Sequence, residues 1–86
     1  MTSLSIPPRK SKELGMLLRD IRQGLSLTQQ QVADAIDIPA EVYGRVERGG
    51  MIPSVAALQK LCLRLGLDYA SVVAQMKGGR EDTALD

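Results

Sequence analysis

Few residues in this chain could carry out covalent chemistry. The sequence has no histidine and a single cysteine, Cys62, which lies in the aliphatic run ALQKLCLRL. A thiol in such surroundings usually packs as a small hydrophobic group. An internal disulfide, a histidine-assisted thiol nucleophile and the common Cys/His zinc sites are therefore excluded. Because the carboxylates are not clustered either, we expect no enzyme, no cofactor and no bound metal.

Side chains suited to hydrogen bonding are concentrated between residues 28 and 48. Gln29 stands in the first turn of a predicted helix, where a phosphate is attracted, and its amide could donate there or reach a base edge. Gln30, the next residue, points elsewhere and could equally face solvent. Arg45 can donate twice to guanine O6 and N7, or it can pair with a phosphate without discriminating between bases. Glu41 could accept from a cytosine amino group or hold Arg45 in an i,i+4 ion pair.

Helices are the elements that must position these side chains. Apolar residues recur at spacings of three and four from Leu14 to Leu25, which predicts an amphipathic helix with Ser11 as its N-cap. Thr28 and Gln31 have the spacing of a capping box, in which each side chain satisfies a free backbone N–H. A second helix is therefore predicted to begin at Thr28.

The second helix is predicted to end near Asp37, and Pro39 is well placed to open a third. That third helix runs from about Ala40 to Arg48 and stops at Gly49-Gly50. Its apolar side turns Tyr43 and Val46 inward, which leaves five residues outward: Ala40, Glu41, Gly44, Arg45 and Arg48.

Two further helices are predicted after a short loop. Ser54 is the expected N-cap of the fourth, whose apolar stripe is Val55, Leu58, Leu61, Cys62 and Leu65 and which Gly66 ends. Asp68 is the expected cap of the fifth, which carries Val72, Val73 and Met76. The chain has no useful strand alternation, so we expect an all-α fold of five short helices.

Length, composition and charge bound the organisation of the chain. Its 86 residues suit one small domain, and 44% of them are apolar although only two are aromatic. The net charge is +1, so affinity for a polyanion must come from where the charges sit. We expect a flexible basic arm (1–12), a folded domain (13–77) and a disordered acidic tail (78–86). Without an apolar stretch of membrane-spanning length or a signal peptide, a soluble cytoplasmic protein is expected.

Residues 14–67 resemble the helix-turn-helix domains of the phage-repressor type, the Cro/C1 or XRE family. The resemblance is carried in order by LLRDIR (17–22), LTQQQVADAI (27–36), VERG (46–49) and PSVAALQKLCLRLGL (53–67). It implies a compact, lambda-repressor-like domain of five helices. It also implies a sequence-specific DNA-binding transcriptional regulator, which we expect to be a dimeric repressor on a palindromic operator.

The resemblance also implies roles for individual residues. Base-edge contacts fall at the positions of Ala40, Glu41, Gly44 and Arg45, although the family more often has a polar residue where this chain has Gly44. A partly buried structural ion pair is implied between Arg22 and Glu47. Val42 could touch a thymine methyl or rest at the margin of the core.

Phosphate contacts are expected at the end of the third helix and in the N-terminal arm. Arg48 and the backbone N–H groups of Gly49, Gly50 and Met51 could position the sugar-phosphate backbone. The glycines could also form an ordinary cap and turn, and the two roles are compatible. In the arm, the three cations could follow phosphates or enter a minor groove, or they could form a solvated leader without function. These arm residues are Arg9, Lys10 and Lys12.

A single domain of this size reads only a few base pairs, which favours a homodimer on two half-sites. Val72, Val73 and Met76 of the fifth helix are the candidate interface, or they cap the core of their own domain. The alternative function is an antitoxin-like or adaptor protein that acts mainly through a protein partner. The acidic tail, REDTALD (80–86), could bind such a partner.

Overall fold

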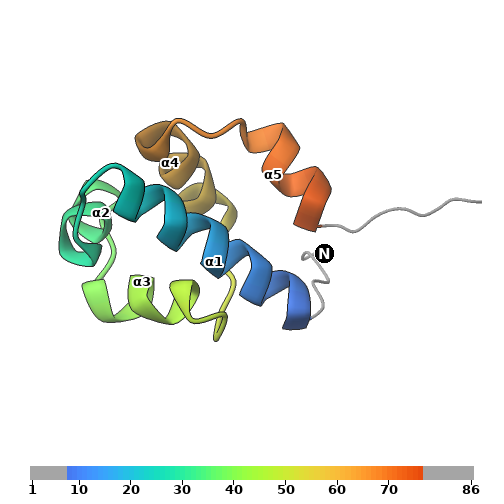
Figure 1. The fold of residues 1–86 in the computed structure, drawn as a ribbon, viewed down its shortest axis with the longest axis horizontal. Coiled ribbons are helices and arrows are strands. Elements are labelled where there is room, and N and C mark those ends of the chain that lie inside the picture. Colours follow the sequence, from blue (N-terminus) through green and yellow to red (C-terminus); the bar gives the residue numbers. More distant parts are fainter. Residues whose placement is uncertain (1–7, 77–86) are drawn as a thin grey trace, which may run out of the picture.

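The computed structural model describes residues 8–76, with side chains from Lys10 onward, and folds them into five helices without a strand (Figure 1). The helices are α1 (Pro8–Gly24), α2 (Gln29–Ala35), α3 (Ala40–Glu47), α4 (Val55–Leu65) and α5 (Tyr69–Met76). The predicted all-α architecture is confirmed. No helix in residues 8–76 is long and apolar enough to cross a membrane.

Local capping residues begin α2, α4 and α5 where the sequence predicts. The Thr28 hydroxyl accepts from the Gln31 N–H at 3.0 Å, and the Gln31 side chain accepts from the Thr28 N–H at 2.8 Å, so the capping box is complete. Ser54 and Asp68 accept in the same way from the first turns of α4 and α5. Each contact satisfies a backbone donor that the start of a helix leaves free.

The first helix begins at Pro8, earlier than the sequence predicts. Proline is tolerated in a first helical turn because its missing N–H would have no partner there. Residues 8–12, assigned above to a flexible arm, are therefore helical, and the prediction of Ser11 as N-cap is wrong. Ser11 is buried within α1. The rest of the predicted arm (1–7) and the predicted tail (78–86) lie outside the described residues.

The core is aliphatic apart from Tyr43, and every helix contributes to it. A fully buried Leu or Val side chain contributes roughly 1.5–3 kcal/mol. Leu25 and Val55, which the sequence placed on the apolar stripes, are half exposed at the end of α1 and the start of α4. The core residues are Leu14, Leu18, Val32, Ala33, Ile36, Tyr43, Val46, Leu58, Leu61, Cys62, Leu65, Val72 and Met76.

Two of the three candidate interface residues on α5 belong to this core. Val72 is 5% exposed and Met76 is 3% exposed. Of the two roles considered for them, packing in the core of their own domain is therefore the one present in this structure. Val73 is only partly buried.

The first helix crosses the middle of the molecule, with α3 on one side and α5 on the other (Figure 1). Gly15 makes the contact between α1 and α3 very close: a Cβ atom there would overlap the carbonyl oxygens of Val46 and Glu47. The helix α3 thus rests directly on the backbone of α1, while Glu41 and Arg45 on α3 are exposed.

Candidate nucleic-acid interface

Helices α2 and α3 are joined by residues 36–39. Ile36 is buried, and Asp37 takes a left-handed conformation with φ of 62°, which aspartate tolerates better than most residues. The Ile38 N–H then donates to the Ala33 carbonyl at 3.0 Å. This tight connection fixes the orientation of α3 relative to α2.

The Arg22–Glu47 pair anchors the end of α3 to α1. Nε of Arg22 lies 2.5 Å from Oε2 of Glu47, and Nη2 lies 3.0 Å from Oε1. The remaining Nη1 donates to the Leu27 carbonyl at 2.8 Å. The side chains of the pair are 11% and 2% exposed. The structure thus brings the two residues together as a buried, bidentate ion pair.

The electrostatics of this pair favour both charges. Burial raises the pKa of the Glu47 carboxyl, but hydrogen bonds from Arg22 and Gln29 outweigh burial and hold that pKa below its ordinary value. The hydrogen bond to Glu47 likewise raises the pKa of Arg22. The ion pair therefore stays charged in the folded protein across the neutral pH range.

Gln29 is bound to the same carboxylate. Its Nε2 donates to Oε1 of Glu47 at 2.9 Å, which directs one amide hydrogen toward the anchor of α3. Gln29 is half-buried in consequence. Gln30 points elsewhere and donates to Asp34 of its own helix at 2.8 Å, so the two neighbouring glutamines have different surroundings.

Gly44 is buried, and the prediction that it faces outward is wrong. The side chains of Gln29 and Arg48 cover it. A Cβ atom at position 44 would lie 3.3 Å from Oε1 of Gln29 and 3.1 Å from Nη1 of Arg48. The absence of a side chain therefore lets these two polar groups lie across the surface of α3.

The accessible part of α3 carries Glu41 and Arg45. These side chains are 80% and 55% exposed and form an ion pair of 3.7 Å. Of the two roles considered for Glu41, the contact with Arg45 is therefore present in this structure. Ala40 and Val42 are half-buried, and Ala40 packs against the core.

The glycines after α3 form a cap and turn, one of their two expected roles. The N–H groups of Gly49 and Gly50 donate to the carbonyls of Val46 and Arg45, at 3.0 and 2.8 Å. The contact of this segment with a phosphate stays a prediction. Arg48 remains exposed beside the two glycines.

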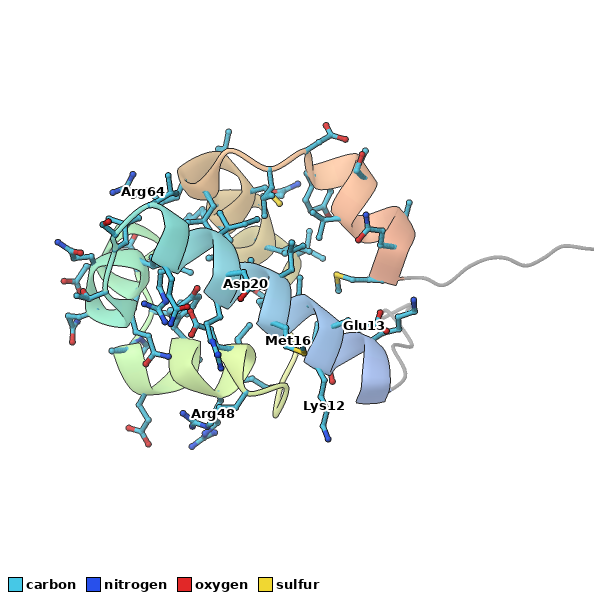
Figure 2. All side chains as sticks on the ribbon, viewed as in Figure 1. Lys12, Glu13, Met16, Asp20, Arg48 and Arg64 are labelled. Atoms are coloured by element: carbon cyan, nitrogen blue, oxygen red, sulfur yellow. The ribbon has the colours of Figure 1, made fainter. Side chains whose placement is uncertain are left out.

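The predicted arm cations are separated by the early start of α1. Lys10 forms an ion pair of 3.3 Å with Glu13, whereas Lys12 is exposed on the side of the molecule where Arg48 lies (Figure 2). The side chain of Arg9 lies outside the described residues. Of the two arm cations whose side chains are described, Lys12 is thus the one placed near the end of α3.

Tyr43 fills the space behind the ion pair and was predicted only as a core residue. Its hydroxyl is buried and makes no hydrogen bond of acceptable geometry with another described residue. Burial raises the pKa of this hydroxyl far above its ordinary value, and the Glu47 carboxylate adds to the effect. The spacing of residues in the sequence does not predict that Tyr43 lies close to Glu47. It also does not predict the hydrogen bond between Gln29 and Glu47.

Comparisons with known proteins agree with this geometry. The family model Helix-turn-helix matches residues 18–71. Among solved structures, the clp gene regulator ClgR from Corynebacterium glutamicum is similar, with 28% identity over 74% of this chain and 68% of its own, and a TM-score of 0.68. The restriction-modification controller protein C.AhdI from Aeromonas hydrophila has 25% identity over 74% of this chain and 97% of its own, with a TM-score of 0.69. Nothing among the curated proteins matches the chain.

Proposed function

Since the chain belongs to the helix-turn-helix family of Cro/C1 (XRE) type and is a DNA-binding transcriptional regulator, we propose that it acts as a dimeric repressor that inserts α3 into the major groove of a palindromic operator. The similarity to two proteins described as a gene regulator and as a controller protein supports a regulatory role.

Helix α3 is held rigidly on its inner side while its polar side stays accessible, and this arrangement supports its insertion into a groove. The pair Arg22–Glu47 and the close packing at Gly15 fix the inner side of the helix. The side chains of Glu41 and Arg45 remain exposed on its outer side. A helix held in this way can enter a groove without paying for reordering of its own backbone.

Arg45 is the residue proposed to read bases. Its ion pair with Glu41 is exposed, and such pairs contribute about 0–1 kcal/mol. A guanine edge can therefore replace the carboxylate at little cost, because a guanidinium donates twice to O6 and N7. Glu41 is then free to accept from a neighbouring cytosine amino group.

Gln29 and Arg48 are proposed to contact the sugar-phosphate backbone beside α3. Both side chains lie over Gly44, close to the helix that enters the groove. Contacts to phosphate position the protein but do not distinguish sequences. Gln30 and Ala40 remain candidates for weaker contacts, the former after release from Asp34.

The dimer is proposed because one α3 helix reads only a few base pairs, whereas two helices read half-sites about 34 Å apart. With Val72 and Met76 in the core, the surface between α4 and α5 is the remaining apolar candidate. Leu63 is 85% exposed there, beside a shallow groove lined by Leu67 and Tyr69, and Val73 is only partly buried on α5. This surface lies across the molecule from α3 (Figure 1), so pairing through it would leave α3 accessible.

Selection of bound sequences from random duplexes, at two salt concentrations, tests the proposal. We expect convergence on an inverted repeat, lost in Arg45→Ala and retained in Arg64→Ala, an equal change of charge on α4 away from α3 (Figure 2). Equal weakening on every sequence in Arg45→Ala would reduce that residue to a phosphate contact. A folded protein that ignores duplex DNA at low salt would instead favour action through a protein partner.

Sedimentation of the free protein and of its DNA complex tests the dimer. We expect two copies per operator, and Leu63→Ser should favour the monomer without changing the fold, because Leu63 contributes little to the core. One copy per selected site would contradict the dimer while leaving DNA binding intact.

A further inference from the structure

The first turns of α1 are packed against the turn that follows α3. The Ser11 hydroxyl donates to the Gly49 carbonyl at 3.1 Å across 38 residues of sequence. Gly49 has a φ of 79°, and a Cβ atom there would lie 2.6 Å from Cγ of Lys12. Glycine is therefore required at position 49 both for its backbone conformation and for the close approach of Lys12.

This packing places the exposed Lys12 beside the turn that follows α3. Lys12 and Arg48 are both exposed, and they project from the same side of the molecule, below α1 and α3 in Figure 2. No acidic side chain among residues 10–76 forms an ion pair with Lys12. The N–H groups of Gly49 and Gly50 donate to carbonyls of α3, so these two backbone donors are occupied and the exposed cations beside them are the better placed to meet a phosphate.

Lys10, only two residues earlier, has different surroundings. It forms an ion pair with Glu13 and lines the groove between α1 and α5, together with Val72 and Met76. Two residues correspond to about 200° around an α-helix, which explains why the two lysines lie on different sides of α1. A flexible arm would have made them equivalent.

We propose that Lys12 is a fixed phosphate contact of the DNA complex, positioned by the docking of Ser11 and Gly49. The inference rests on the proposed function and deepens it, since it adds a contact from α1 to those of α2 and α3. Ser11 acts here as a positioning residue: it holds the first turns of α1 against the turn, and Lys12 meets the phosphate.

The test compares Lys12→Ala with Lys10→Ala, which removes the same charge from the same helix. Affinity for the selected duplex is measured by titration over a series of salt concentrations. The slope of log K against log salt is negative, and each lost phosphate contact reduces its magnitude by about 0.9. We expect that change in Lys12→Ala and no change in Lys10→Ala, and we expect Lys12→Ala to weaken specific and non-specific duplexes alike.

A double-mutant cycle tests the role of Ser11. Ser11→Ala should weaken DNA binding when Lys12 is present and should have little effect when Lys12→Ala is already in place. An equal loss in both backgrounds would show that Ser11 supports the fold in general and would overturn its positioning role. Thermal unfolding of each variant checks that the domain remains folded.

The failures of the two proposals are distinguishable. A wild-type chain that binds no duplex refutes the proposed function and the role of Lys12 with it. A wild-type chain that binds while Lys12→Ala keeps the full salt slope refutes Lys12 alone. An equal reduction of the salt dependence in Lys10→Ala and Lys12→Ala would show that DNA affinity depends on total charge. The docking of α1 at Gly49 would then have no role in binding.

Discussion

Nε2 of Gln29 lies 2.9 Å from Oε1 of Glu47. The residue that opens α2 is thereby bound to the residue that anchors α3. Since the same carboxylate oxygen also accepts from Nη2 of Arg22, three helices meet at one buried anion. The relative placement of α1, α2 and α3 therefore depends on Glu47 more than on any exposed residue.

Glu47→Ala should lower the free energy of unfolding by about 3–5 kcal/mol, because Arg22 would keep a buried charge without its partner. Urea unfolding at neutral pH, followed by circular dichroism, measures the loss. Glu41→Ala is the matched control: it removes the partner of the exposed Arg45 and should change stability by less than about 1 kcal/mol. Equal effects of the two variants would contradict the structural importance of the buried pair.

Acid should destabilise the protein partly through Glu47. The pKa of this carboxyl is lowered on folding from its ordinary value of 4.5, so its contribution to stability is fully present above that value. It is lost as the pH falls through the lower pKa of the folded state. Urea unfolding between neutral and acid pH should therefore show a shallower acid dependence in Glu47→Gln than in wild type. Parallel pH curves for the two proteins would disprove this linkage.

Tyr43→Phe should leave stability at neutral pH unchanged or raise it, because the lost hydroxyl is buried without a hydrogen bond of good geometry. Folding raises the pKa of Tyr43 above its ordinary value of 10.0, so wild type should lose stability as the pH rises beyond that value. The phenylalanine variant should lack that part of the alkaline loss. A destabilisation of more than about 1 kcal/mol at neutral pH would instead indicate a strong hydrogen bond to Glu47.

Gly44→Ala should separate stability from DNA binding. Alanine favours a helix over glycine by about 1 kcal/mol, but the added methyl would meet Gln29 and Arg48 at 3.1–3.3 Å and displace them. We expect equal or higher stability with weaker binding to the selected duplex. Gly24→Ala is the control, since a Cβ atom there meets nothing within 4 Å. Wild-type affinity in Gly44→Ala would show that the covering of Gly44 has no role in recognition.

Local residues in the sequence determined where most helices begin and end. Thr28 and Gln31 are three residues apart, and Ser54 and Asp68 each accept from the first turn of their own helix. Such contacts depend only on the neighbouring few residues, so their spacing predicts them. The family resemblance added the long-range pair Arg22 and Glu47, which periodicity alone does not connect.

The tertiary structure decided which helix faces are buried by neighbouring elements and which polar side chains remain exposed. Periodicity placed Gly44, Val72 and Met76 on helix faces, but only the packing of neighbouring elements buries them. The same holds for Lys12, which meets Gly49 across 37 positions of the chain. Such contacts arise where distant elements happen to approach, and no local spacing encodes that approach. The sequence therefore determined the helices, and the packing of α1 against α3 decided which polar side chains of α3 remain accessible.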